Sequence, residues 1–133
     1  MPRIEFPVAL DRKFQLWSFD VSHSVLLLRS VGDGASTRID VMFRAVREMR
    51  VRKVVEGLAL DIVRDGDPRL VEFGVAPDPY RHVFAVSSPG FPYGYVIAAS
   101  VFTAEDDLSY GDPSALDHSE LEGHVIRSTY FES

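Results

Sequence analysis

Residues 38–44, Arg-Ile-Asp-Val-Met-Phe-Arg, decide how this chain is interpreted, because two regular structures compete for them. Apolar and polar side chains alternate up to Phe43, which predicts a strand with one buried face. Apolar residues also recur at a spacing of about four between positions 41 and 49, which suits a helix capped by Asp40. The clean alternation and the β-branched side chains favour the strand, with a change of conformation near Ala45.

Working outward, apolar runs of strand length recur along most of the chain. Residues 14–20 and 25–31 flank a short polar junction, and we expect them to form an antiparallel hairpin. Three successive leucines at 26–28 place apolar side chains on both faces of the second strand, so it is expected in the interior of its sheet. Further strands are predicted at residues 57–63, 70–75, 82–86, 93–103 and 125–131.

Turn-forming sequences separate these runs and define the fold class. Residues 32–34 (Gly-Asp-Gly) and 65–68 (Asp-Gly-Asp-Pro) are typical of loops. Near the C-terminus, Asp112 precedes a proline and Gly123 follows, which predicts a short helix over residues 113–122. We therefore expect an α+β fold that is mainly β: an antiparallel sandwich or half-barrel with one short C-terminal helix.

The length of 133 residues suits a single domain spanning 1–133. The absence of cysteine excludes a disulfide framework, thiolate chemistry and sulfur-ligated zinc. Residues 82–104 lack Asp, Glu, Lys and Arg, but turn chemistry interrupts them at 87–94, so we predict no membrane span. No signal-peptide pattern is visible near the N-terminus, and we expect a cytoplasmic location.

Charge is unevenly distributed. The formal net charge is −6, yet residues 38–53 carry +4 and the residues after position 100 carry −7. The basic segment suggests a surface for an acidic protein partner. The alternative is a solvated face, or two regions that neutralise each other within one fold or across a homodimer. The acidic total, and the lack of aromatics within the basic segment, argue against nucleic-acid binding. The candidate partner-binding residues are Arg44, Arg47, Arg50, Arg52 and Lys53.

A possible metal site lies in the expected C-terminal helix. His118 and Glu122 are four residues apart, and His124 follows shortly. Imidazole and carboxylate at helical spacing can share a divalent ion such as zinc, iron or manganese. The alternative is ordinary surface ion pairing on a solvated helix. No other cofactor is expected.

Residues 91–95, Phe-Pro-Tyr-Gly-Tyr, form a second candidate site. Phe91, Tyr93 and Tyr95 next to proline and glycine can make a platform for a ligand. The alternative is that the glycine shapes a turn and the tyrosines begin the next strand and pack inward.

No catalytic residue is assigned. Asp20, Ser22 and His23 cluster at the first expected hairpin, but neighbours in a strand point to opposite faces, and the chain has no Gly-x-Ser-x-Gly elbow. We expect these side chains to bond to the backbone at the turn.

Several of these stretches resemble a family pattern. The sequences Ser22-His23-Ser24, 26–30, 38–43 and 57–58 look like a pattern in small uncharacterised bacterial domains. The order of a His-containing turn, a Leu-rich strand and a strand ending in Phe is also similar, in outline, to some immunity proteins of bacterial toxin systems. The resemblance covers roughly residues 14–63. It implies a compact α+β or β-sandwich domain that acts by binding, and it supplies no catalytic residue.

The sequence therefore predicts a non-enzymatic domain that acts by protein-partner binding or homo-oligomerisation. The alternative is a small metal-dependent enzyme that uses His118 and Glu122 with another histidine.

Overall fold

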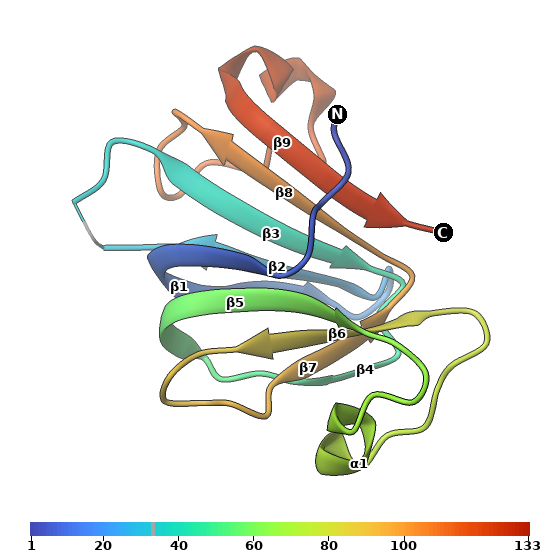
Figure 1. Cartoon of the computed structure of the whole chain (residues 1–133). Helices are drawn as coiled ribbons and strands as arrows, with labels where there is room; N and C mark the ends of the chain where they lie inside the picture. The colour runs from blue at the N-terminus through green and yellow to red at the C-terminus, as the bar shows by residue number, and fades with distance from the viewer. Residues whose placement is uncertain (33) are drawn as a thin grey trace.

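The computed structural model describes residues 1–32 and 34–133, so the expected loop at 32–34 contains one residue, Asp33, outside the described part. Within it, the chain forms nine strands, with one short helix between the fifth and sixth strands and a second between the eighth and ninth (Figure 1). The strands are β1 (Val8–Asp20), β2 (Val25–Ser30), β3 (Arg38–Arg44), β4 (Glu48–Arg50), β5 (Val54–Val63), β6 (His82–Ser87), β7 (Tyr95–Ala98), β8 (Ser100–Asp106) and β9 (Val125–Glu132); the helices are α1 (Arg69–Phe73) and the 3-10 helix η1 (Ser119–His124).

All nine strands belong to one antiparallel sheet in the order β4-β7-β6-β5-β1-β2-β3-β8-β9. β3 pairs with β8 and β4 pairs with β7, although β3 and β4 follow each other in the chain, as do β7 and β8. Two backbone hydrogen bonds connect the link between β3 and β4 to the link between β7 and β8. The Ala99 amide donates to the Arg44 carbonyl (3.0 Å), and the Arg47 amide donates to the Ile97 carbonyl (2.8 Å). The sheet therefore bends back on itself, and the expected sandwich of two sheets is not confirmed.

The stretch that was ambiguous in the sequence is a strand. Residues 38–44 form β3, and the chain changes direction at Ala45, which has a φ of 55°. The leucine-rich strand β2 lies between β1 and β3, in the sheet interior as expected. The expected hairpin and the strands at 57–63, 82–86 and 125–131 are also confirmed.

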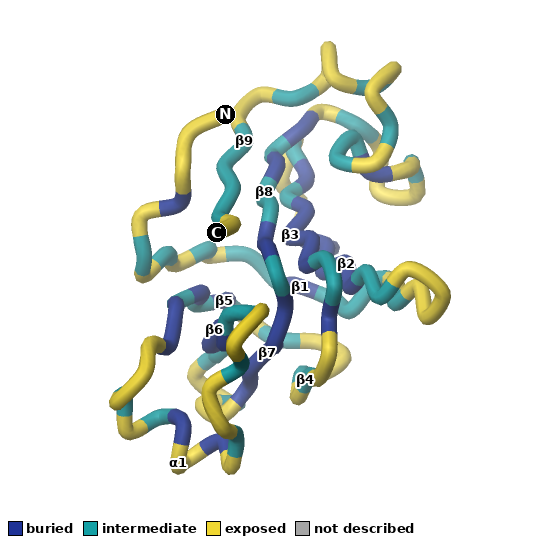
Figure 2. The backbone as a smooth tube through the Cα atoms, turned by 90° about the vertical axis from the view of Figure 1, so that its right-hand side faces the viewer, coloured by how far each residue is buried: buried dark blue, intermediate teal, exposed yellow. Residues whose placement is uncertain are grey.

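The core lies on the concave side of the bent sheet. Alternate residues of β2 and β3, including Leu26 and Phe43, are fully buried there, and the Phe43 ring lies 5.7 Å from that of Phe84 on β6. A second, smaller cluster joins α1 to the other face of β6 and β7 through Phe73 and Tyr95. Figure 2 shows that the buried backbone follows the strands, whereas the exposed backbone is concentrated in the loops.

Two predicted elements are wrong, and both errors involve helices. Residues 70–75 were expected as a strand, but α1 begins after Asp67-Pro68 and ends at Gly74, whose φ is 73°. Residues 113–122 were expected as a helix, but only η1 forms, starting at Ser119. The carbonyl groups of Asp112 and Pro113 accept hydrogen bonds from arginine side chains instead of helical amides.

A third prediction is right only in part. The expected strand at 93–103 divides at Ala99 into β7 and β8. No helix within the described residues has the length and apolar character needed to span a membrane.

A candidate protein-binding surface

The basic segment and the aromatic loop, recognised separately in the sequence, meet in the structure. β4 pairs with β7 so that Arg50 lies opposite Tyr95. The guanidinium carbon of Arg50 is 5.7 Å from the centre of the Tyr95 ring. The guanidinium carbon of Arg52 is 4.7 Å from the centre of the Phe91 ring, and its Nη1 donates a hydrogen bond of 2.9 Å to the Gly90 carbonyl. Each arginine is therefore held over an aromatic ring.

The ring beneath Arg50 is itself fixed. Tyr95 is buried and stacks on Phe73 of α1, with 5.2 Å between ring centres. Its hydroxyl donates to Glu48 at 2.5 Å. Burial, reinforced by this hydrogen bond to Glu48, raises the pKa of the Tyr95 hydroxyl. The bond also occupies the carboxylate of the one acidic residue in 47–53.

The loop that carries Phe91 is tightly built. Ser88 and Phe91 exchange backbone hydrogen bonds of 3.1 and 2.9 Å, and the Val86 amide donates to the Gly94 carbonyl at 2.9 Å. A Cβ atom at Gly94 would lie 2.1 Å from the Val86 carbonyl oxygen, so this position requires glycine. The Phe91 ring is therefore presented from a loop whose conformation is set by its backbone.

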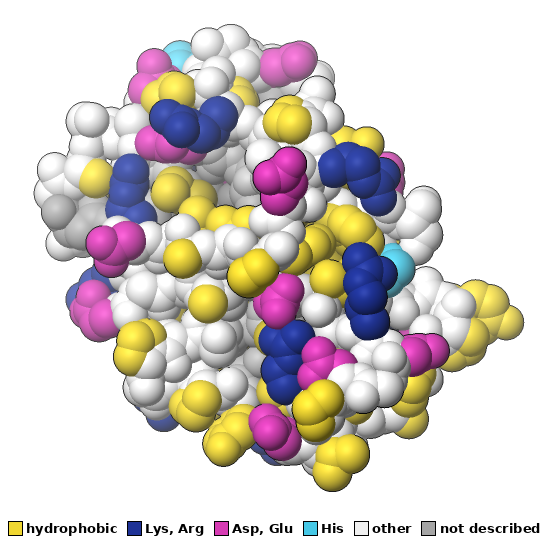
Figure 3. All heavy atoms as spheres, viewed as in Figure 1, with side chains coloured by type: hydrophobic (Ala, Val, Ile, Leu, Met, Phe, Trp, Pro, Cys, Tyr) yellow, Lys and Arg dark blue, Asp and Glu magenta, His cyan; other side chains and the backbone are white. Residues whose placement is uncertain are grey.

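The exposed part of this region consists of basic side chains and one open ring. Arg50, Arg52 and Lys53 are exposed, and Tyr93 is 50% exposed. Within the described residues, no hydrogen bond or ion pair engages the side chain of Arg50 or Lys53. On the face seen in Figure 3, by contrast, acidic and basic side chains are interspersed. We call Arg50, Arg52, Lys53, Phe91 and Tyr93 the basic–aromatic surface.

Two of the five predicted basic residues point elsewhere. Arg44 Nη2 donates to the Leu116 carbonyl and to Asp117 Oδ1, both at 3.0 Å. Arg47 forms an ion pair with Asp78. The pKa of Asp78 is lowered, first by the hydrogen bond from the Tyr80 amide and then by the charge of Arg47. For these two arginines the alternative holds, because acidic residues of the same fold neutralise them.

Two buried ion pairs anchor the segment 107–118 to the sheet, and no local sequence pattern indicated them. Arg29 on β2 donates to both carboxylate oxygens of Asp40 on β3, at 2.7 and 3.0 Å. Arg38 donates to Asp106 on β8 at 3.0 Å. All four side chains are at least 96% buried. The remaining guanidinium donors bind backbone carbonyls at Ser109, Tyr110, Asp112 and Pro113.

This arrangement satisfies the buried charges and fixes the covering segment without helical hydrogen bonds. A neighbouring aromatic contact reinforces it: Trp17 lies 4.8 Å from the Arg29 guanidinium and 4.8 Å from the Tyr110 ring. The network is a structural device, because its donors and acceptors are directed at one another.

The predicted metal-binding residues are not brought together as a site. His118 has extended backbone angles and precedes η1, so the α-helical spacing to Glu122 does not form. His118 Nδ1 lies 3.2 Å from Glu120, and His124 Nδ1 lies 2.8 Å from Asp107. Among residues 1–32 and 34–133, no three histidine or carboxylate side chains are grouped closely enough to hold a metal ion.

The polar turn between β1 and β2 is more closely knit than the sequence indicated. Ser22 Oγ donates to Asp20 at 2.8 Å, and His23 Nδ1 lies 3.0 Å from the other Asp20 oxygen, so Ser22 and His23 do not diverge. Hydrogen bonds from Ser22 and His23 lower the pKa of Asp20. The same nitrogen, Nδ1, faces both partners of His23, whereas a catalytic triad uses the two ring nitrogens separately.

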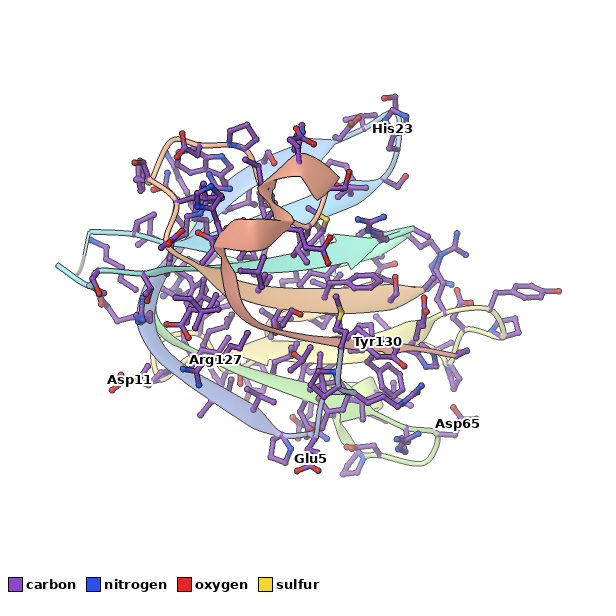
Figure 4. The ribbon with its side chains drawn as sticks, turned by 90° about the horizontal axis from the view of Figure 1, so that it is seen from above. Glu5, Asp11, His23, Asp65, Arg127 and Tyr130 are labelled. Atoms are coloured by element: carbon purple, nitrogen blue, oxygen red, sulfur yellow. The ribbon has the colours of Figure 1, made fainter. Side chains whose placement is uncertain are left out.

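Figure 4 shows His23 at the tip of this hairpin, away from the other labelled residues. Its side chain is 75% exposed, so the cluster stabilises a turn in solvent.

Comparison of the chain with protein-family models, curated proteins and solved structures finds no match. The resemblance to immunity proteins therefore stays a prediction.

Proposed function

We propose that this domain binds a protein partner through the basic–aromatic surface, and that the contact region of the partner is acidic. One observation carries the proposal: Arg52 and Phe91 are 39 residues apart in the chain, yet the guanidinium carbon of Arg52 lies 4.7 Å from the centre of the Phe91 ring. Two sequence features that each suggest binding thus form one exposed surface.

The composition of the surface suits protein recognition. Arginine and tyrosine are enriched among the residues that contribute most to protein interfaces. Arginines already held over rings lose less conformational freedom on binding than mobile side chains do. The excess positive charge would also accelerate encounter with an acidic partner at low ionic strength.

The binding mode agrees with what the resemblance to immunity proteins implies, because such domains act by binding.

The partner can also be a second copy of the chain, since the residues after position 100 carry a charge of −7. Measuring the mass of the wild type in solution at several concentrations distinguishes a homo-oligomer from a monomer that awaits another protein.

The test compares charge reversal inside and outside the surface. The variant Arg50→Glu/Lys53→Glu changes the surface, and the matched control Arg64→Glu/Arg127→Glu makes the same change in net charge at two exposed residues outside it. The probes are two fluorescein-labelled peptides that differ only in having glutamate or lysine at their charged positions, with phenylalanine between them. Fluorescence anisotropy gives the affinities.

We expect the wild type to prefer the glutamate peptide. The surface variant should bind it at least about tenfold more weakly, which corresponds to about 1.4 kcal/mol. The control should stay within about twofold of the wild type, because exposed charges far from the contact are screened by salt. Equal losses in the two variants would show that net charge alone acts, and the proposed surface would then be wrong.

A further inference from the structure

We infer that the basic–aromatic surface recognises closely spaced carboxylates on its partner, through two guanidinium groups held over rings, and does not merely attract negative charge. This inference rests on the proposed function and specifies the chemistry of the partner: an extended acidic segment with carboxylates at alternate positions.

Arg52 is oriented by two contacts that leave most of its donors free. Its guanidinium group lies over the Phe91 ring, and one hydrogen bond from Nη1 to the Gly90 carbonyl fixes its rotation. A guanidinium group has five N–H donors in a planar fork. Within the described residues no other acceptor engages the Arg52 side chain, so Nε and Nη2 are available to a carboxylate.

Arg50 is supported in a different way. It lies over Tyr95, which is held from beneath by Phe73 and at its hydroxyl by Glu48. This layered arrangement limits the movement of the guanidinium plane while leaving its edge in solvent. The short helix α1 thus has a role in the surface, because it supplies Phe73.

The spacing of the two arginines defines the partner. Met49 and Val51 both pack against the main core cluster, so Arg50 and Arg52, which alternate with them, lie together on the opposite side of the chain. Residues two apart in an extended chain are separated by about 6.6 Å. Carboxylates at alternate residues of an extended partner segment have the same repeat and can meet both guanidinium groups at once.

Single-stranded nucleic acid is the competing occupant, and the rings favour the acidic peptide. A nucleic-acid platform needs several open ring faces on which bases can stack. The arginines lie over Phe91 and Tyr95, and Tyr95 is buried, so only Tyr93 of the segment 91–95 presents a largely open ring.

The test uses substitutions that preserve charge. Arg52→Lys keeps the positive charge but removes the planar fork that binds a carboxylate through two hydrogen bonds. Phe91→Leu keeps an apolar side chain but removes the ring under Arg52. Arg64→Lys, at an exposed arginine outside the surface, is the matched control. Thermal denaturation confirms that each variant is folded before binding is measured.

Three labelled probes are compared by anisotropy: a peptide with glutamates at alternate positions, a peptide of the same composition with the glutamates regrouped, and an oligothymidylate. We expect Arg52→Lys and Phe91→Leu to bind the alternating peptide roughly five- to tenfold more weakly, and Arg64→Lys to remain within about twofold of the wild type. The wild type should prefer the alternating peptide over the regrouped one.

Equal binding of the two peptides, or wild-type affinity in Arg52→Lys, would overturn the inference. The proposed function would survive that result if Arg50→Glu/Lys53→Glu still weakened binding. Tighter binding of the oligothymidylate than of either peptide would overturn both, and so would a wild type that binds neither peptide.

Discussion

Replacing Asp40 by asparagine tests the buried network under segment 107–118. Asp40 is fully buried and accepts two hydrogen bonds from Arg29, which is 1% exposed. Asparagine keeps the shape of the side chain but removes its charge, so Arg29 remains buried without its counter-ion. The other cation near this carboxylate, Arg38, lies 3.9 Å away and is already paired with Asp106.

The expected cost follows from that geometry. Breaking a buried ion pair by removing one partner typically costs about 3–5 kcal/mol, because a charge is left uncompensated. Small domains are stable by only about 5–15 kcal/mol, so Asp40→Asn should remove a large part of the free energy of unfolding. Arg29→Met should cost a similar amount, since it leaves Asp40 without its main partner and removes the hydrogen bond to the Tyr110 carbonyl, while the Asp112 carbonyl keeps only its bond from Arg38.

Urea denaturation of a double-mutant cycle measures the effect. Trp17, the single tryptophan, packs on both Arg29 and Tyr110, so its fluorescence reports on docking of the segment. The double variant Arg29→Met/Asp40→Asn should cost about 2–3 kcal/mol less than the sum of the single variants. A loss below about 1 kcal/mol in Asp40→Asn, or strict additivity, would refute the view that this pair holds the segment in place.

Two further predictions concern other parts of the fold. Gly94→Ala should destabilise the protein by roughly 3 kcal/mol, because the added Cβ would meet the Val86 carbonyl oxygen. The measurement is the midpoint of denaturation, which should fall. A change in stability below about 0.5 kcal/mol would contradict the close approach. Burial first, and the charge of Arg64 second, lower the pKa of His82, so the unfolded chain takes up a proton before the folded protein as pH falls below about 6.5. Stability should therefore decline as pH falls through about 6.5, and less steeply in His82→Gln. Equal slopes in the two proteins would show that His82 is not responsible.

Strands β2 and β3 could be predicted because their signal is local. The alternation in residues 38–44 indicates a strand with one apolar face, which is β3. The three leucines at 26–28 indicate a strand that is apolar on both faces, which is β2. The helices were misplaced because two similar signals compete. Asp67-Pro68 followed by Gly74 marks a real helix start and end, whereas Asp112-Pro113 with Gly123 does not.

The difference between those two signals is non-local. Arg29 and Arg38 reach Asp112 from strands more than seventy residues earlier and occupy its carbonyl, and Arg38 also binds that of Pro113. No window of sequence around position 112 contains this information. The candidate surface depends on distance in the same way, because the contact of Arg52 with Phe91 is set by the pairing of β4 with β7. The residues were predictable, but their meeting was not.

The way in which Arg29 and Arg38 hold the covering segment has a consequence for how the protein can change. Arg38 binds Ser109 and Pro113 through their carbonyl oxygens, which every amino acid possesses. Substitutions at these two positions can therefore alter the outer surface while leaving the anchoring bonds intact, whereas Arg38 itself has no equivalent replacement. This part of the molecule separates the residues that maintain the architecture from those that are free to diverge, and it offers a place to insert new surface chemistry by design.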